Sequence, residues 1–412
     1  MKRHKQRVIA HVDMDCFYVE VERKLDPSLY GRPVAVVQYN TAGDLRTVSP
    51  EEDRRTERAA QGIIAVSYEA RARGVKRIMT GDEARRVCPD IALVRVPVKH
   101  GKADLTPYRN AGAAVAAILD KRASRCEKAS IDEVYIDVTE EAYERAKDWL
   151  TGKYIQLARS SHVAGQGDAA AALSVEAIRR GHSGGGGGEG QGSFEELVES
   201  WWSRFPEDWA EDERILVCGA TIVSELRSEI STTLQYNCSA GVAHSKMFAK
   251  LASAMHKPNQ QTVVPSCMLP GLLKKLEISR IKGLGAKFGE AVEQKLGIKT
   301  AGELAAVPLA KLQALFGEEH GQWLWEVSHG IDKADVQQRV HSKSISCGKT
   351  FRGKNALRSL DQVSNWVEEF AREVFERLQK DMADNDRRPT TICVSFTPNT
   401  SKTDGKSNSV SR

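Results

Sequence analysis

The sequence predicts a mixed α/β (α+β) protein built from several domains. Its 412 residues exceed a single domain of roughly 150 residues, so two to four domains are expected. Segments with the Val- and Ile-rich composition of strands alternate along the chain with amphipathic segments typical of helices. Apolar residues make up 41% of the chain, which excludes a disordered or fibrous protein and allows several buried cores.

The first half of the chain is expected to supply most of the strands. The first strand ends in the acidic run Asp13-Met14-Asp15, and Pro89 stops the first expected helix. The expected strands of this half are residues 7–13, 34–39, 63–68 and 131–138. The expected helices are residues 82–88 and the alanine-rich residues 108–121.

The second half is expected to be mainly helical. Ser245 is a suitable N-cap for a helix, and short helices broken by Gly and Pro are expected up to a linker near residue 335. The expected long helices are residues 215–230, 245–256 and 360–383. The expected strands are residues 235–243, 342–350 and 390–397.

The net charge of +5 is unevenly distributed along the chain. Residues 140–213 contain 15 acidic and 7 basic residues, which leaves a net +13 on the remainder. Residues 62–128 contain 14 basic and 7 acidic residues. Such a basic body favours a polyanionic partner, most simply nucleic acid, although lysines that only confer solubility remain an alternative.

Two segments are expected to be insertions without a chemical role. Residues 152–194 include five consecutive glycines at 184–188, a composition typical of a flexible surface insertion. Residues 41–61 carry charges of both signs and predict a loop or a short solvated helix.

The spacing of the cysteines and the length of the apolar runs bear on the redox state of the thiols and on membrane association. The eight cysteines are scattered without a CxxC pair, which favours reduced thiols and disfavours a zinc finger. No apolar run approaches the roughly 18 residues of a membrane span, so no membrane association is expected.

Three acidic residues at strand ends predict a metal site. Asp13 ends one strand, and Asp132 and Glu133 form a doublet on another. Converging carboxylates can hold two Mg²⁺ ions about 3.5–4 Å apart, which activate a hydroxyl and stabilise a displaced phosphate. Adjacent strand residues face opposite sides, so the doublet requires a tight hairpin or a bulge. An Asp-x-Asp alone is more often a solvated loop.

Other catalytic signatures are missing. The sequence contains no HExxH, no GxSxG and no complete Walker A motif. Gly348-Lys-Thr350 matches only the end of a Walker A motif, and Gly283, Gly285 and Gly289 miss the GxGxxG spacing by one residue. ATPase and dinucleotide-binding functions are therefore disfavoured.

Several motifs in order along the chain resemble the Y-family translesion DNA polymerases. The matching motifs are residues 12–18 (VDMDCFY), 35–39 (AVVQY), 64–71 (IAVSYEAR), 74–77 (GVKR), 130–135 (SIDEVY), 238–243 (CSAGVA) and 256–259 (HKPN). Within the family the chain is most similar to the eukaryotic eta branch, on the basis of Gln38, Arg77 and residues 101–105.

This resemblance implies a right-hand polymerase with a ferredoxin-like palm, small fingers, a helical thumb with a helix-hairpin-helix, and a little finger. The implied domains are the palm (1–16 and 106–255), the fingers (17–105), the thumb (256–335) and the little finger (336–412). Only one strand–helix–strand half of the little finger is recognisable, so the chain is expected to be C-terminally truncated relative to the family.

The resemblance also implies the metal ligands. Asp13, Asp132 and Glu133 match the catalytic acids that bind two Mg²⁺ ions (Mn²⁺ is possible), and the Met14 carbonyl is a further ligand. Asp15 matches no ligand, and a role as a turn or cap residue is the better interpretation.

Further roles follow from the same resemblance. Tyr18 matches the steric gate that excludes a ribonucleotide 2′-hydroxyl, and Gln38 and Ile64 match template and base contacts. The expected nucleotide-binding residues are Cys16, Phe17, Tyr18, Tyr68, Arg71, Arg77 and Lys257. In the helix-hairpin-helix, the expected contacts to DNA phosphate are Lys282, Gly283, Gly285 and Lys287.

The implied function is template-directed DNA synthesis past damaged bases such as ultraviolet pyrimidine dimers. Primer-template DNA and dNTPs are the expected partners, and the nucleus is the expected location. The clamp-binding and ubiquitin-binding tails of the eukaryotic family are not recognisable in this sequence. Two alternatives remain, a palm-type nucleotidyl cyclase and a DNA-binding scaffold without catalysis.

Overall fold

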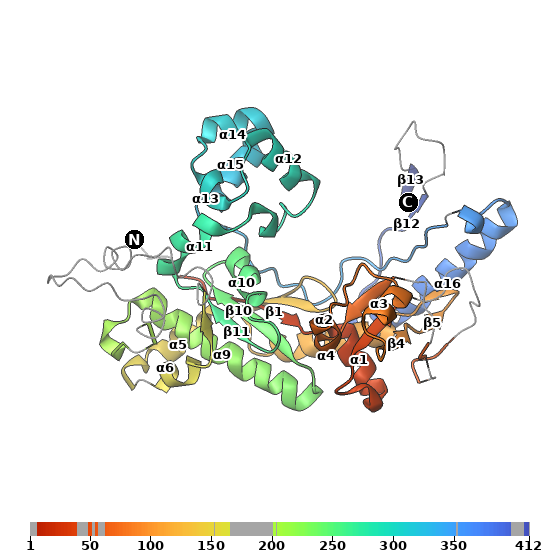
Figure 1. Cartoon of the computed structure of the whole chain (residues 1–412), viewed down its shortest axis with the longest axis horizontal. Helices are drawn as coiled ribbons and strands as arrows, with labels where there is room; N and C mark the ends of the chain where they lie inside the picture. The colour runs from red at the N-terminus through yellow and green to blue at the C-terminus, as the bar shows by residue number, and fades with distance from the viewer. Residues whose placement is uncertain are drawn as a thin grey trace. The chain divides into compact units, whose positions relative to one another are not determined.

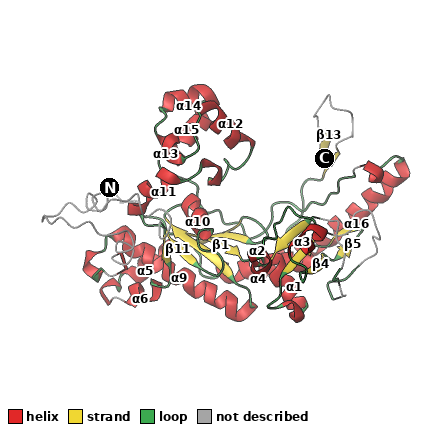
Figure 2. Ribbon diagram, in the orientation of Figure 1, coloured by secondary structure: helices red, strands yellow, loops and turns green. Residues whose placement is uncertain are grey.

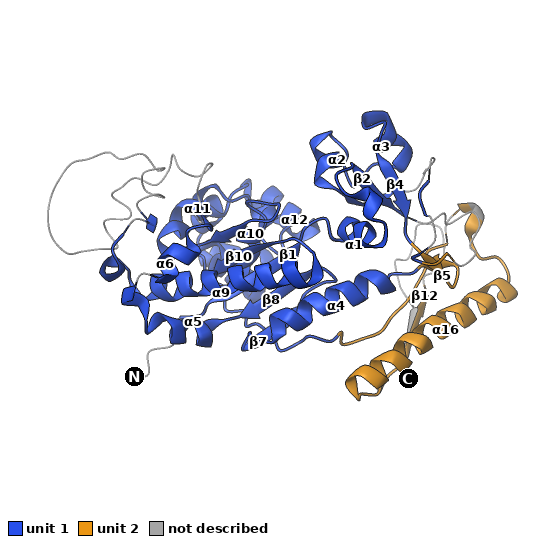
Figure 3. Cartoon of the chain, turned by 90° about the horizontal axis from the view of Figure 1, so that it is seen from below, with its two compact units in different colours: residues 1–38, 50–96, 104–341 blue, residues 39–49, 97–103, 342–412 orange. Residues whose placement is uncertain are grey.

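The computed structural model describes the chain in two compact units. The described residues are 6–38, 48–51, 54–56, 62–151, 153–164, 201–202, 204–351, 353–396 and 408–411. The larger unit holds most of the chain up to His341, and the smaller unit holds residues 48–49 and 97–103 together with the described residues from Ser342 onward (Figure 3).

A six-stranded sheet forms the centre of the larger unit. Its strand order is β7-β8-β1-β10-β11-β9. The strands are β1 (Ile9–Met14), β7 (Arg125–Lys128), β8 (Glu133–Asp137), β9 (His162–Val163), β10 (Cys238–Ala243) and β11 (Gln261–Val263). β1 pairs antiparallel with both β8 and β10, whereas β10, β11 and β9 run parallel. The first strand of the sequence is therefore central and flanked on both sides.

Helices cover both faces of this sheet. The helices are α4 (Thr106–Asp120), α5 (Thr139–Ala146), α6 (Lys153–Ala158), α9 (Glu211–Leu234) and α10 (Lys246–Ser253). α9 and α10 lie on opposite faces of β10 (Figures 1 and 3). α10 approaches closely because Gly241 has no side chain: a Cβ there would lie 2.0 Å from the Ala249 carbonyl oxygen. Gly219 allows the same close approach between α9 and Val8.

A second, three-stranded sheet has the order β3-β2-β4. The elements of this region are α1 (Phe17–Leu25), β2 (Val34–Val37), β3 (Ile63–Val66), α2 (Tyr68–Ala72), α3 (Gly81–Val87) and β4 (Ala92–Arg95). β2 is buried along its whole length, and it contributes to an apolar core that includes Val66, Ala84 and Leu93. The continuous Val and Ile runs of these strands reflect this burial.

A group of short helices follows α10. The helices are α11 (Leu269–Lys275), α12 (Lys287–Leu296), α13 (Ala301–Ala305), α14 (Leu309–Phe316) and α15 (Glu318–Ser328). Phe248 of α10 shares one apolar core with Leu273, Val292 and Leu324 of these helices, so this region packs directly on the sheet-covering helix. Figure 2 shows this region as helices joined by loops.

The smaller unit contains two short sheets and one long helix. Its elements are β5 (Val98–Lys99), β6 (Lys102–Ala103), α16 (Leu360–Asn385), β12 (Cys393–Phe396) and β13 (Asn408–Ser411). The chain also contains short 3₁₀ helices at Pro27–Leu29, Trp149–Thr151, Pro206–Asp208, Ser266–Met268, Ile278–Arg280 and Gly353–Asn355.

Three sequence expectations need correction. Residues 342–350 form no strand, because no partner strand pairs with them in the described chain. Residues 153–164, assigned to a flexible insertion, instead form α6 and β9, with Ile155 and Val163 buried. Residues 165–200 lie outside the described residues.

The third correction concerns the charged segment 41–61. Arg54 was expected in a solvated loop, but its side chain is buried and forms an ion pair with the buried Glu22. Its guanidinium also donates to the Arg95 carbonyl at 2.5 Å. Within this segment, residues 41–47, 52, 53 and 57–61 lie outside the described residues.

The state of the cysteines and the hydropathy of the helices match two expectations from the sequence. All eight cysteines are free, as the scattered spacing predicted. None of the helices in the described part of the chain has the length and hydropathy needed to cross a membrane.

Candidate active site

Two predicted catalytic acids face each other across the central sheet. Asp13 on β1 is paired in register with Glu133 on β8, so both side chains lie on one face of the sheet. His11 and Tyr135 form the next pair on this face, with ring centroids 4.6 Å apart. This is the face that α10 covers, since His11 contacts Ser253 at the end of that helix.

The third acid stands at the tight turn that the sequence required. β7 and β8 form a hairpin, and Asp132 precedes the first residue of β8. The Ser130 hydroxyl oxygen accepts from the backbone N–H groups of Asp132 and Glu133, at 3.2 and 3.0 Å. The Met14 N–H donates to the Asp132 carbonyl at 3.0 Å, which joins the turn to the end of β1. Ser130 therefore acts as the turn residue of this hairpin.

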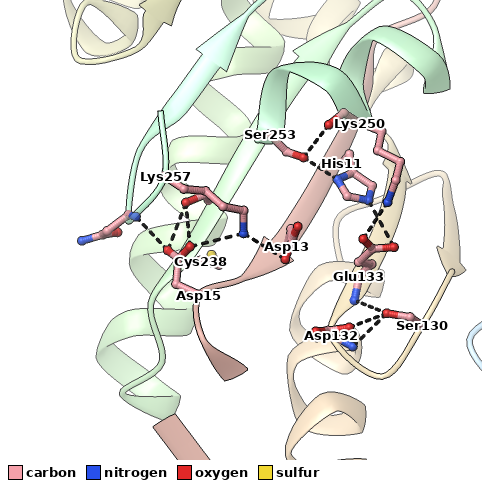
Figure 4. Close-up of polar contacts among 12 residues, drawn as sticks. His11, Asp13, Asp15, Ser130, Asp132, Glu133, Cys238, Lys250, Ser253 and Lys257 are labelled. Atoms are coloured by element: carbon pink, nitrogen blue, oxygen red, sulfur yellow. Dashed lines mark hydrogen bonds and ion pairs between the residues drawn. The ribbon is translucent and has the colours of Figure 1, made fainter. Parts of the chain in front are cut away.

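Two of the three predicted catalytic carboxylates form ion pairs with lysines. Lys257 Nζ lies 3.0 Å from Asp13 Oδ1, and Lys250 Nζ lies 2.6 Å from Glu133 Oε1 (Figure 4). Burial raises the pKa of Asp13; the charge of Lys257 opposes this rise, and the charges of Glu133 and Asp132 add to it. The site therefore concentrates negative charge that cations must balance.

The residues fit divalent metal ions in their chemistry. Three carboxylates and a backbone carbonyl from Met14 are the oxygen donors that Mg²⁺ prefers. As they stand, no three acidic, His or Cys side chains in the described residues are close enough to enclose a metal ion. The two lysines now hold Asp13 and Glu133, and a metal ion bound there would compete with them for the carboxylates.

His11 is a site residue that sequence reasoning missed. Its ring is fully buried, and Nδ1 donates to Ser253 Oγ at 2.7 Å because that hydroxyl donates to the Lys250 carbonyl. Burial, together with the nearby Lys250 charge, holds the pKa of His11 well below its usual value, so the ring is neutral. A lone His in an apolar strand carries no spacing signal that could have revealed it.

The start of α1 presents the expected nucleotide-binding segment. Cys16 adopts a left-handed conformation with φ 37°, which turns the chain from β1 into the helix that begins at Phe17. The first-turn N–H groups of a helix lack intrahelical acceptors and suit a phosphate. Burial raises the pKa of Cys16 to about 12, so its thiol stays protonated.

The Tyr18 ring packs against the ring of Tyr108. Their ring centroids lie 4.2 Å apart, and Tyr108 is fully buried and donates its hydroxyl hydrogen to Glu22. Burial raises the pKa of Tyr18 and the Asp132 charge adds to the effect, whereas the charge of Arg77 opposes it. Tyr18 thus stands in the electrostatic field of one expected catalytic acid.

Tyr68 and Arg71 lie together on α2, as their spacing predicted. The Arg71 guanidinium lies 4.7 Å from the centroid of the Tyr68 ring, and its Nε donates to the Val66 carbonyl. The Tyr68 hydroxyl donates to Asp15 at 3.1 Å, which brings α2 to the end of β1.

The expected base contacts come from neighbouring strands. Gln38 follows β2, and its N–H donates to the Gly62 carbonyl just before β3, the strand that carries Ile64. Both side chains are half-buried, whereas Arg77 is exposed on the turn after α2.

The Gly-rich connection before α12 joins the 3₁₀ helix Ile278–Arg280 to that helix. Gly283 has φ 98° and packs against Trp323, where a Cβ would lie 3.2 Å from the ring. Lys282 Nζ lies 5.6 Å from the centroid of the Tyr135 ring, whereas Lys287 is the exposed first residue of α12. Lys282 therefore lies near the central sheet, whereas Lys287 lies at the exposed start of α12.

Comparison with known families accounts for most of the chain. A family model described as impB/mucB/samB family matches residues 12–254. A model described as DNApol eta/Rev1, HhH motif matches residues 276–331, and one described as impB/mucB/samB family C-terminal domain matches residues 342–412.

Curated relatives agree with these matches. DNA polymerase eta of Arabidopsis thaliana is 44% identical over 388 residues, covering 94% of this chain and 52% of the relative. DNA polymerase eta of Drosophila melanogaster is 36% identical over 414 residues, covering 96% and 42%. DNA polymerase IV of Methanoculleus marisnigri is 31% identical over 392 residues, covering 95% and 81%.

The chain thus spans about half the length of the eta polymerases that it matches. The resemblance seen in the sequence motifs is confirmed by matches to the catalytic, helix-hairpin-helix and C-terminal regions in order. The chain therefore belongs to the impB/mucB/samB family, the Y-family DNA polymerases.

Proposed function

We propose that this chain is a template-directed DNA polymerase that extends a primer past damaged bases such as ultraviolet pyrimidine dimers. The observation that carries the proposal is the arrangement of Asp13 and Glu133 on paired strands, with Asp132 at the adjoining turn. Similarity to two polymerases named eta supports the translesion role.

The proposed reaction is nucleotidyl transfer. The primer 3′-oxygen bonds to the α-phosphorus of a dNTP, the bond to pyrophosphate breaks, and the hydroxyl proton is released. Two Mg²⁺ ions, when bound, lower the pKa of that hydroxyl and stabilise charge on the phosphates. Asp13, Asp132, Glu133 and the Met14 carbonyl would hold them.

The remaining site residues bind and align the substrates in this proposal. The Tyr18 ring lies against the sugar and excludes a 2′-hydroxyl, while Gln38, Ile64 and Arg77 contact the paired bases. The start of α1 with Tyr68, Arg71 and Lys257 binds the triphosphate, a polyanion that suits N–H groups and cations. Primer-template phosphates contact the hairpin at Gly283 and the lysines near it.

The proposed domains follow the right-hand plan. The six-stranded sheet is the palm, the β3-β2-β4 region the fingers, the α11–α15 region the thumb, and the chain after the linker a part of the little finger. We place the protein in the nucleus, where its eukaryotic relatives would meet damaged template.

Primer extension with Mg²⁺ on undamaged and dimer-containing templates tests the proposal. The purified chain should extend both, and Asp132→Ala should abolish extension, while Asp148→Ala, an exposed acid in the same unit, should not. No extension on either template, or full activity in Asp132→Ala, would contradict the proposal. Nucleotide turnover that needs no DNA would favour a nucleotidyl cyclase instead.

A further inference from the structure

Asp15, for which the sequence favoured a turn or cap role, is a buried carboxylate that accepts hydrogen bonds from several segments beside the predicted catalytic acids. Its side chain is 3% exposed. Oδ1 accepts from the Tyr68 hydroxyl at 3.1 Å and from Lys257 Nζ at 3.3 Å, and Oδ2 accepts from the Asn259 N–H at 2.7 Å. The Ser239 hydroxyl lies 3.0 Å from both oxygens. These donors come from α2, β10 and the loop after α10.

A local capping role does not account for these contacts. The N-cap of α1 is Cys16, and no side chain caps that helix. The side chains that donate to Asp15 are 53, 224 and 242 residues away in the sequence. The carboxylate therefore joins distant segments, and its function has to be sought in what those segments carry.

Asp15 differs from Asp13 in what its oxygens can still bind. The side chain of Asp13 is 21% exposed and pairs with Lys257, so a metal ion can reach it. Both Asp15 oxygens already accept from donors that are fixed in the fold. A buried carboxylate is costly unless its lone pairs are satisfied, and here they are. Asp15 is therefore suited to hold other groups rather than a metal ion.

Lys257 lies between the two carboxylates, at 3.0 Å from Asp13 and 3.3 Å from Asp15 (Figure 4). A cation bound at Asp13 would compete with this ammonium for the carboxylate. Asp15 offers Lys257 a second acceptor, which would keep the ammonium beside the site. The same Asp15 oxygen holds the Tyr68 hydroxyl.

We propose that Asp15 is a positioning residue for triphosphate binding, which holds the Lys257 ammonium and the Tyr68 hydroxyl ready before a nucleotide arrives. This inference rests on the proposed polymerase function. Preorganised donors lose less side-chain entropy on binding, so removal of their anchor weakens nucleotide binding more than it slows the chemical step.

The test is steady-state primer extension by Asp15→Asn, which keeps the shape and removes the charge. The amide has one acceptor oxygen, so one of the fixed donors meets an N–H group instead. We expect the KM for dNTP to rise roughly ten- to a hundredfold, with a smaller change in kcat. The matched control is Glu213→Gln, another buried acid, bonded to Arg204 at the start of α9. It should lower Tm without changing KM.

A double-mutant cycle separates positioning from a merely structural role. In a Lys257→Met background, Asp15→Asn should raise KM far less than it does alone, because the residue it positions is gone. Multiplicative effects on KM, or an unchanged KM in Asp15→Asn, would overturn the inference. If Asp15→Asn does not fold, Ser239→Ala replaces it: a several-fold KM rise supports the inference, and an unchanged KM contradicts it.

Failure of the proposed function gives a different result. A wild-type chain that binds Mg²⁺-dNTP but extends no primer would contradict the proposed polymerase function. It would leave the positioning role of Asp15 open to test. In that case the dissociation constant for Mg²⁺-dNTP, measured for wild type and Asp15→Asn with a fluorescent dNTP, replaces KM as the readout, and an equal value in both overturns the inference.

Discussion

The two longest helices of the described chain, α9 and α16, differ sharply in how they are held. α9 has 24 residues, of which twelve are buried beneath the six-stranded sheet. α16 has 26 residues and none of them is buried. Phe375 of α16 is 58% exposed, whereas Ile222 of α9 is inaccessible. Amphipathic sequence is enough to define both helices, but only a packed layer turns such a face into core.

In the smaller unit, ion pairs and hydrogen bonds rather than buried apolar side chains hold α16. Lys102 pairs with Glu373 at 2.8 Å, Lys99 pairs with Glu376 at 2.5 Å, and Lys349 donates to the Gly101 carbonyl at 2.9 Å. The Lys99–Glu376 pair is half-exposed, and such a pair contributes little to stability and weakens with salt. The comparison therefore predicts that substitutions of the same kind have large effects in the larger unit and small effects in the smaller one.

The largest effect is expected at the turn that carries Asp132. If the proposed function holds, Asp132→Ala should lower kcat/KM for dNTP about a thousandfold or more, because it would remove a metal ligand that contributes several kcal/mol of transition-state stabilisation. Glu376→Ala, the removal of an acid in α16, should leave the chemical step unchanged. Single-turnover extension measures both, and equal losses would contradict the assignment of the chemistry to Asp132.

A matched pair of phenylalanines tests the cores. Phe248→Ala should lower the free energy of unfolding by about 4 kcal/mol, since the ring is buried between α10 and the short helices. Phe375→Ala should cost less than about 1 kcal/mol, because its ring is already mostly in water. Chemical denaturation followed by far-UV circular dichroism gives both values. Similar costs would mean that α16 is buried in solution.

A pair of glycines gives a smaller contrast. Gly241→Ala should destabilise by about 3 kcal/mol, because the new Cβ meets the backbone of α10. Gly348→Ala should change stability by less than about 0.5 kcal/mol, because nothing in the described chain lies within 4 Å of its Cβ position. Thermal unfolding compares the two variants with wild type. A stable Gly241→Ala protein would show that α10 can move away from the sheet.

The smallest effect is expected for Glu376→Gln and depends on pH. Its hydrogen bond to Lys99 lowers the pKa of Glu376, so the carboxylate stabilises the folded unit above its unfolded pKa, near 4.3. This contribution is lost as the pH falls through the lowered folded-state pKa. The variant should lose a few tenths of a kcal/mol at pH 7 and nothing near pH 3. Hydrogen exchange of the α16 amides, corrected for intrinsic rates, measures this loss of stability. A loss that persists at pH 3 would contradict the assignment of the effect to the Glu376 carboxylate.

Part of the site could be predicted from sequence because its residues are neighbours in the chain. Asp132 and Glu133 are adjacent, and their need for a tight turn follows from strand geometry, as the β7–β8 hairpin confirms. Tyr68 and Arg71 meet because three residues span one helical turn. The catalytic roles of these residues stay predictions.

Other features depend on contacts that no spacing reveals. Strand-like composition at residues 342–350 predicted a strand, yet a strand forms only where a partner supplies hydrogen bonds. Arg54 was placed in a solvated loop, and only the fold shows that Glu22 lies opposite it.

By itself, the sequence determined the family, the mixed α/β class, most of the helices and strands, and which acids stand at strand ends. Tertiary structure alone decided that Asp15 is a buried anchor and that His11 is a neutral ring beside Glu133. It also decided that α9 is core and α16 is surface. The reason is physical: local propensity depends on residues a few positions apart, whereas burial and pairing depend on segments up to hundreds of residues away.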